Sequence, residues 1–182
     1  MRPFHAIASA SLALALNLLW VAGAPGRPVA TFQLNSPAFS SGSMIPAKYT
    51  CDGAEVSPAL SWNDPPASTK TFALIVDDPD APGGIWVHWV IYDIPANVRG
   101  LPEGVPKSIE LQNGARQGWN DFRKIGYGGP CPPRGSNHRY SFRLYALDRY
   151  AQLPASGSKS DLEREMKGHI LAQAELVGRY QH

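Results

Sequence analysis

Residues 71–90, TFALIVDDPDAPGGIWVHWV, decide the fold. The apolar run at 72–76 predicts a short strand, because it is rich in residues that favour β structure. Asp, Pro and Gly fill residues 77–84 and predict a polar turn, since Pro fixes φ and lacks a donor while Asp and Gly favour turns. The strand pattern resumes over 85–91 with His88 inside it. Carboxylates should therefore lie at one strand end and an imidazole on the next strand.

A second stretch far downstream, residues 126–140 (GYGGPCPPRGSNHRY), has a similar character. Its Gly and Pro residues predict a turn, and His138 and Tyr140 then enter a strand. Apolar and polar side chains alternate over 140–146, as in a half-buried strand. Two polar turns, each beside a histidine-bearing strand, predict one shared pocket.

The chain as a whole is expected to be mainly β, or α+β by strict count. It has 182 residues, enough for one domain with a sizeable core, and its 17 Pro and 17 Gly favour a loop-rich protein. A capping box at Ser160 and Glu163 predicts a short helix to about residue 169. The Gly- and Asn-rich residues 110–122 are expected to form a functional or mobile surface loop. Further strands are predicted over 31–39, 49–51, 59–62 and 170–179.

The first 24 residues have the pattern of a cleaved secretory signal, which would leave a domain over 25–182. Arg2 is followed by an uncharged apolar run at 6–21 and by small residues. The alternatives are a membrane anchor or a buried helix, but the run is short for a spanning helix. We therefore expect an exported protein, periplasmic or secreted, with no stable membrane span after signal removal.

Net charge and cysteine content limit the partners and the compartment. The formal charge of +2 is too small to indicate a nucleic-acid partner. The two cysteines, Cys51 and Cys131, form an even pair, which in an exported protein predicts a disulfide. Two separate buried thiols are the alternative. A bond closing so long a loop would stabilise the fold by about 2–4 kcal/mol.

Two carboxylates and two imidazoles stand in and beside the polar turns: Asp78, Asp80, His88 and His138. We predict no metal and no cofactor there, because no tight ligand spacing such as HxH or HxxxH is present. A hydrolase would need a nucleophile beside a base. Ser136 and Ser141 lie near His138 in sequence, but no nucleophile-elbow motif accompanies them.

Together these residues predict a site for a phosphate or carboxylate ligand. A carboxylate beside an imidazole raises the imidazole pKa and fixes its tautomer, so that the outward N–H can face an anion. Glycines at 126, 128 and 129 would let backbone N–H groups approach the ligand, as in anion-binding nests. Tyr140 could add a phenolic donor, and Trp86 could hold an apolar tail.

Several motifs resemble those of the phosphatidylethanolamine-binding protein family, and the similarity spans nearly the whole chain after the leader. The resemblance is greatest to the bacterial branch that is often called Raf-kinase-inhibitor-like. The motifs are YTCDG at 49–53, SPALSW at 57–62, DPDAP at 78–82, HW at 88–89, GGPCPP at 128–133 and HRY at 138–140.

The resemblance implies a β-sandwich with a large antiparallel-rich sheet, one or two short helices and a small pocket for phosphate-bearing head groups. It places these residues around the pocket: Asp78, Asp80, Trp86, His88, Gly128, Pro130, His138 and Tyr140. Kinase inhibition is not implied, because an exported protein would not meet a cytosolic kinase.

We therefore predict a binding or inhibitory module without catalysis, whose ligand is a small anion such as a phospholipid head group. Two alternatives remain open. One is a hydrolase that uses a pocket histidine as general base. The other is an inhibitor of a protease or another protein, acting through surface loops. The sequence names no protein partner.

Overall fold

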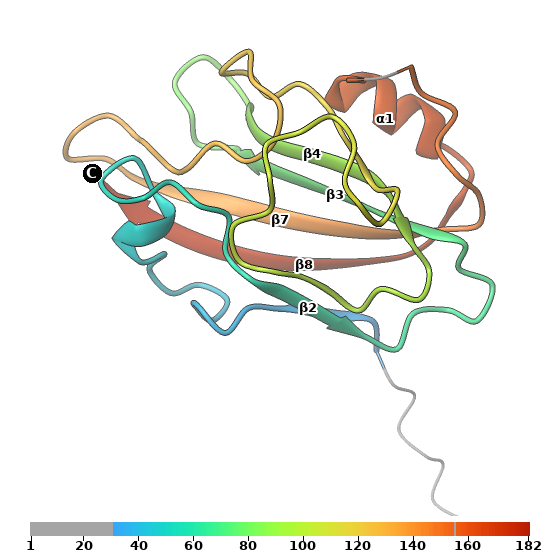
Figure 1. The fold of residues 1–182 in the computed structure, drawn as a ribbon. Coiled ribbons are helices and arrows are strands. Elements are labelled where there is room, and N and C mark those ends of the chain that lie inside the picture. The colour runs from blue at the N-terminus through green and yellow to red at the C-terminus, as the bar shows by residue number, and fades with distance from the viewer. Residues whose placement is uncertain (1–30, 155) are drawn as a thin grey trace, which may run out of the picture.

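Two antiparallel β-sheets form the framework in the computed structural model, which describes residues 31–154 and 156–182 (Figure 1). The larger sheet has the order β6-β4-β3-β7-β8: Arg116–Gln117, Trp86–Pro95, Thr71–Asp78, Asn137–Leu147 and Ile170–Gln181. The smaller sheet has the order β1-β2-β5: Gln33–Asn35, Leu60–Asn63 and Gly100–Leu101. One α-helix, α1 (Lys159–Met166), and one 3-10 turn, η1 (Ala47–Tyr49), complete the described elements.

This architecture confirms the predicted fold class, which was mainly β with a large antiparallel sheet. The strand expected at 31–39 is shorter than predicted. No strand forms at 49–51, because Tyr49 ends the η1 turn and residues 50–51 follow it. The loop expected at 110–122 carries only the two-residue strand β6. The proposed leader at 1–24 lies outside the described residues. No helix in the described part of the chain is long and apolar enough to cross a membrane.

Strand β3 is the centre of the larger sheet, and all of its residues are buried. Successive side chains of a strand point to opposite faces. Phe72 and Leu74 therefore enter the core between the two sheets, whereas Ala73 and Ile75 enter a second core that includes residues of α1. Burial on both faces explains why this segment is a continuous apolar run in the sequence.

The strand continues through Asp77, where the sequence predicted a turn. Asp77 is fully buried, and its carboxylate accepts hydrogen bonds from Arg143 of β7 and from Lys159 Nζ, the latter at 2.6 Å. Two cations offset the unfavourable burial of one carboxylate, so the strand can extend past it. Lys159 is the first residue of α1, and this contact therefore also fixes the helix against the sheet.

Helix α1 begins two residues earlier than its sequence signal indicated. Its cap is Ser158, whose hydroxyl accepts from Asp161 N at 3.2 Å while Asp161 Oδ2 accepts from Ser158 N at 3.0 Å. The capping box predicted for Ser160 and Glu163 was therefore wrong. The Asp161 side chain takes the place of the Glu in the reciprocal hydrogen bonds of a capping box. Leu162, the next residue of the helix, is buried in the second core.

The predicted pairing of Cys51 with Cys131 is confirmed, because the two residues form a disulfide with a Cα–Cα distance of 5.5 Å. It joins the segment after η1 to the turn before β7. Figure 1 shows that this turn, the β3–β4 turn and the end of β8 lie at one end of the larger sheet, opposite α1. Antiparallel pairing explains this, because it brings the end of β3 beside the starts of β4 and β7.

Candidate functional site

A cavity of about 300 Å³ opens at this end of the sheet. Strands β3, β4 and β7 supply its polar residues, and the turns around them supply its apolar wall. The lining residues are Asp78, Ala81, Pro82, Gly83, Trp86, His88, Phe122, Cys131, Pro132, Pro133, His138 and Tyr140.

Five of the eight residues predicted for the pocket line this cavity: Asp78, Trp86, His88, His138 and Tyr140. The two turns predicted to share a pocket do so, although 60 residues separate Asp78 from His138. The other three predicted residues, Asp80, Gly128 and Pro130, are not among its lining residues.

Asp78 and His138 form a buried pair at the base of the site. His138 Nδ1 lies 2.7 Å from Asp78 Oδ2, and Asp78 Oδ1 accepts from Asp80 N at 2.8 Å. Because the carboxylate holds the Nδ1–H of the ring, Nε2 is the atom that His138 can offer to a ligand. That atom donates a hydrogen bond only when the ring is protonated.

His88 is held by a backbone carbonyl instead of a carboxylate. Its Nδ1 lies 2.8 Å from Gly128 O, and the side chain is 2% exposed. Burial lowers the pKa of His88 and outweighs the opposing effects of the Gly128 carbonyl and of Asp78. The expectation of a raised imidazole pKa is therefore wrong for His88. The neutral ring donates from Nδ1 and has an acceptor at Nε2.

Tyr140 places a buried hydroxyl beside these groups. The residue is 1% exposed, and its Oη has no hydrogen-bond partner of normal geometry among the described residues. Burial first, and the Asp78 charge second, raise the pKa of Tyr140. The hydroxyl therefore keeps its proton at neutral pH and is available as a donor.

Asp80 is engaged elsewhere, which corrects its predicted place in the pocket. Its Oδ2 accepts from Arg139 N and Nε, each at 2.9 Å, and its Oδ1 accepts from Arg139 Nη2 at 2.6 Å. These bonds to Arg139 lower the pKa of Asp80 to about 2. Asp80 thus fixes the β3–β4 turn against the start of β7, and its backbone N–H orients Asp78.

The predicted glycine nest is not formed, because two of its N–H groups bind inside the protein. Gly128 N donates to His88 O at 2.9 Å, and Gly129 N donates to Glu55 Oε1 at 3.2 Å. Gly128 therefore positions His88 through its own backbone, because its N–H donates to the His88 carbonyl and its carbonyl accepts from His88 Nδ1. A Cβ at Gly128 would lie 2.6 Å from the Phe122 ring, so a glycine is needed where this ring approaches.

Trp86 was predicted for the apolar wall of the pocket, whereas Phe122 of the same wall was missed by sequence reasoning. The Phe122 ring packs edge-on against Trp86 and His88, with ring centroids 5.4 Å and 5.2 Å away. Phe122 is the last residue of the loop 110–122, which was predicted to be functional or mobile. The aromatic side chain in that loop was the only sequence signal that could have pointed to it. Pro130, which was predicted to line the pocket, instead accepts a hydrogen bond from Cys51 N at 3.1 Å.

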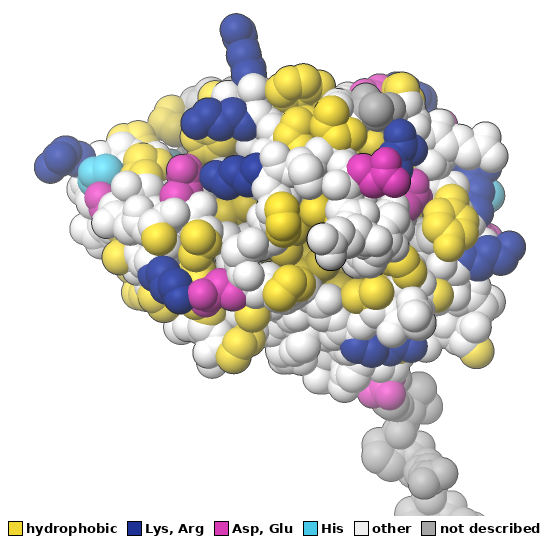
Figure 2. Space-filling view, viewed as in Figure 1, with side chains coloured by type: hydrophobic (Ala, Val, Ile, Leu, Met, Phe, Trp, Pro, Cys, Tyr) yellow, Lys and Arg dark blue, Asp and Glu magenta, His cyan; other side chains and the backbone are white. Residues whose placement is uncertain are grey.

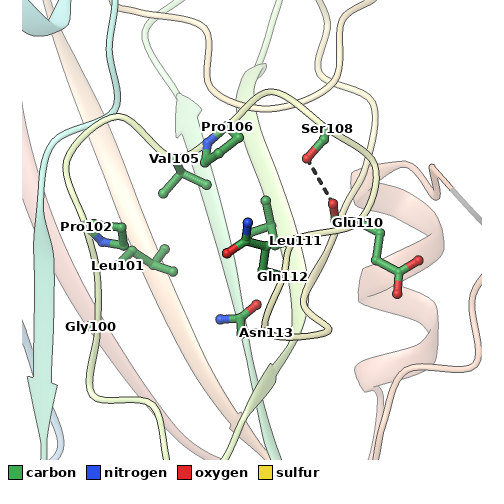
Figure 3. A pocket seen from close by; sticks show the side chains of 10 residues that line it. All are labelled: Gly100, Leu101, Pro102, Val105, Pro106, Ser108, Glu110, Leu111, Gln112 and Asn113. Atoms are coloured by element: carbon green, nitrogen blue, oxygen red, sulfur yellow. Dashed lines mark hydrogen bonds between the residues drawn. The ribbon is translucent and has the colours of Figure 1, made fainter.

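A second, larger cavity of about 470 Å³ lies between β5 and the segment 105–113. Figure 3 shows Leu101, Val105 and Leu111 projecting towards it, whereas the Glu110 carboxylate points away. Its lining residues include no His, Lys or Arg. Despite its size, it therefore offers no cationic donor to an anion.

Charge on the visible face of the molecule is mixed. Figure 2 shows Lys and Arg side chains interspersed with Asp and Glu instead of gathered in one patch. This face therefore produces no field of a single sign that would attract a large polyanion.

These observations define a class: a two-sheet β protein with a small pocket of histidine, aspartate and tyrosine at one end of the larger sheet. Residues 35–181 match the family model of phosphatidylethanolamine-binding protein, and the chain belongs to this family.

Relatives and solved structures agree with this assignment. The chain is 50% identical over 147 residues to a UPF0098 protein of Methanothermobacter thermautotrophicus, covering 81% of this chain and 97% of that protein. The crystal structure of CT736 of Chlamydia trachomatis, described as a homologue of phosphatidylethanolamine-binding protein, is 43% identical with a TM-score of 0.76, covering 84% of this chain and 98% of that chain. Escherichia coli YbcL, described as a new member of the mammalian family, is 35% identical with a TM-score of 0.78, covering 84% and 99%.

Proposed function

We propose that this chain binds a small phosphate-bearing ligand in the pocket lined by Asp78, His88, His138 and Tyr140, and releases it unchanged. The observation that carries the proposal is the buried Tyr140 hydroxyl, which has no hydrogen-bond partner of normal geometry among the described residues and stands beside two oriented histidines. Buried polar groups normally have hydrogen-bond partners, so a ligand oxygen is the natural complement of this one. The family name, phosphatidylethanolamine-binding protein, supports the same ligand class.

Each polar group of the pocket has a distinct part in binding. Protonated His138 donates from Nε2 to one phosphate oxygen, and Tyr140 donates its O–H to another. Neutral His88 accepts at Nε2 from the hydroxyl of a singly protonated phosphate. Asp78 balances the charge of His138 and does not face the anion directly, because its oxygens already accept from His138 and from Asp80 N.

The size and rim of the cavity favour a head group over a whole lipid. A volume of about 300 Å³ accommodates a phosphate with a short substituent. At the mouth, Trp86 is 40% exposed, and its neighbour Ile85 is 56% exposed. These side chains would contact the apolar part of a ligand that extends out of the pocket.

Binding should be linked to proton uptake. His138 donates from Nε2 only when its ring is protonated, and neutral His88 accepts only from a phosphate that itself carries a proton. The complex therefore holds more protons than the separated protein and dianionic ligand, so the affinity should rise as the pH falls from about 8 towards 6.

Calorimetric titration with inorganic phosphate and with phosphorylethanolamine across this pH range tests the proposal. His138→Ala should weaken binding by roughly 1.5–3 kcal/mol, the range for a hydrogen bond to a charged group. His169→Ala is the matched control, because His169 pairs with Asp148 at 2.8 Å outside the pocket. A flat affinity, or unchanged binding by a variant lacking both His88 and His138 side chains, would place the anion elsewhere.

Analysis of the ligand recovered after incubation with the protein separates binding from catalysis. A hydrolase would use neutral His88 as a base towards water, and the recovered ligand would then be cleaved. Recovery of intact phosphorylethanolamine after prolonged incubation supports a binding module. Release of inorganic phosphate that stops in His88→Ala would favour the enzyme.

We also propose that the chain is exported, on the basis of the leader pattern at residues 1–24 and the disulfide. N-terminal sequencing of the exported protein should begin near Ala24. Recovery of the exported protein with Met1 intact would contradict signal removal.

A further inference from the structure

The disulfide has a histidine beside it. His182 Nδ1 lies 3.4 Å from Cys51 Sγ and 3.7 Å from Cys131 Sγ, and the three atoms all lie within 4.8 Å of one another. Both cysteines are exposed and His182 is half-buried, so reagents in solution can reach the group. The anion pocket does not use His182.

The geometry of this group is close to that of a zinc site. Zinc binds thiolate sulfur at about 2.3 Å and imidazole nitrogen at about 2.0–2.1 Å, so a tetrahedral ion holds a sulfur and a nitrogen about 3.5 Å apart. The two nitrogen–sulfur distances, 3.4 Å and 3.7 Å, already match this spacing. Once the S–S bond is broken, the sulfurs need only separate to about 3.8 Å, which side-chain rotation at exposed residues permits.

Asp52 supplies the outer contact that such a ligand needs. Its Oδ1 lies 3.7 Å from His182 Nε2, and its Oδ2 accepts from the Tyr180 hydroxyl. A carboxylate beside the far ring nitrogen favours the tautomer whose Nδ1 lone pair is free for a metal.

Backbone hydrogen bonds hold the three ligand-bearing segments together independently of the disulfide. Cys51 N donates to Pro130 O at 3.1 Å, and Gly135 N donates to His182 O at 3.1 Å. Strands β7 and β8 also pair up to Asn137 and Gln181. The ligand positions therefore stay close to one another when the S–S bond is absent.

We propose that reduction converts this disulfide into a zinc site formed by Cys51, Cys131 and His182, with Asp52 orienting the histidine. A dithiol reductant transfers two electrons and two protons to the S–S bond, which gives two thiols and the oxidised reductant. Zinc then replaces the two thiol protons, which pass to solvent, and accepts the Nδ1 lone pair of His182. Water completes the tetrahedron. The oxidised protein cannot bind zinc in this way, so the site is controlled by redox state.

The expectation of no metal concerned the polar turns around His88 and His138, and Cys51, Cys131 and His182 show no ligand spacing in the sequence either, because they are scattered along the chain. The antiparallel pairing of β7 with β8 and the bond from Gly135 N to His182 O bring His182 to the cysteines. The proposal does not depend on the anion-binding function, although Cys131 borders both sites.

Zinc content in the two redox states tests the proposal. The full chain is analysed as isolated and after reduction with dithiothreitol, desalting under argon and incubation with zinc chloride. We expect about one retained zinc per reduced chain and none in the oxidised protein. Reduced His182→Ala should bind zinc at least 10-fold more weakly. Asp52→Asn should weaken binding by no more than His182→Ala does, because Asp52 acts through His182. His169→Ala should bind as the parent does.

Thermal melting keeps the test decisive if reduction weakens the fold. Zinc should raise the melting temperature of the reduced parent, or restore its folding, and have no such effect on reduced His182→Ala. Cobalt in place of zinc should give a thiolate charge-transfer band in the reduced parent and in reduced His169→Ala, but not in the oxidised parent. A reduced parent that retains no zinc and gains no stability from it would overturn the proposal, as would equal binding by His182→Ala.

Discussion

Replacing Tyr140 by Phe should separate the stability of the protein from its affinity for the ligand. The substitution removes one buried hydroxyl that has no hydrogen-bond partner among the described residues and leaves the ring in place. An unsatisfied buried polar group costs about 1–3 kcal/mol. The free variant should therefore be at least as stable as the parent and more stable by up to that amount, which corresponds to a gain of about 2–4 °C per kcal/mol.

The effect of the same change on binding should have the opposite sign. If the hydroxyl donates to a phosphate oxygen, its loss should weaken binding by roughly 1.5–3 kcal/mol, which is about a 10- to 150-fold increase in Kd. Urea denaturation without ligand and calorimetric titration with inorganic phosphate measure the two effects on the same preparations.

Tyr127 provides the matched control. It is 2% exposed, but its hydroxyl donates to Tyr49 O at 2.9 Å. Tyr127→Phe should therefore destabilise the free protein, because it leaves a buried carbonyl without this donor, while phosphate affinity stays unchanged. If Tyr140→Phe destabilised the free protein as much as Tyr127→Phe, or bound phosphate as tightly as the parent, the reasoning about the Tyr140 hydroxyl would be refuted.

Two further predictions concern the supports of the pocket. Burial lowers the pKa of His88, so near the ordinary pKa of about 6.5 the unfolded chain binds more protons than the folded chain. The free energy of unfolding should therefore fall as the pH drops from 7.5 to about 5.5. Urea denaturation of His88→Gln should show a smaller fall. An equal fall in this variant would mean that other groups cause it. Gly128→Ala should cost about 1–3 kcal/mol by overpacking against Phe122, whereas Gly83→Ala, which meets nothing within 4 Å, should be near neutral in the same assay. Equal stability of the two glycine variants would contradict the close approach of the ring.

Sequence reasoning located the central hairpin and the polar residues of the pocket because both depend on local signals. Residues 71–90 carry a buried strand, a polar turn and a second strand in direct succession, and the fold uses them in that order. The positions of His88 and Asp78 follow from this hairpin alone.

Contacts between strands distant in sequence could not be predicted in the same way. Strand β3 pairs with β7 as well as with β4, and this order places Arg139 beside Asp80. Without that order, Asp80 was indistinguishable from a free carboxylate facing a ligand. Phe122 was missed for the same reason, since its approach to His88 depends on the path of a long loop.

The Cys51–Cys131 bond also determines how the molecule would extend under mechanical force. It spans 80 residues and closes a covalent ring that contains β3 and β4 but neither β7 nor β8. Tension applied to the two chain ends passes through the sulfur atoms and bypasses the ring. The stretched oxidised chain should therefore be about 260–290 Å shorter than the reduced chain, at about 3.3–3.6 Å per bypassed residue. Pulling would detach β7 and β8 from a ring that itself bears no load.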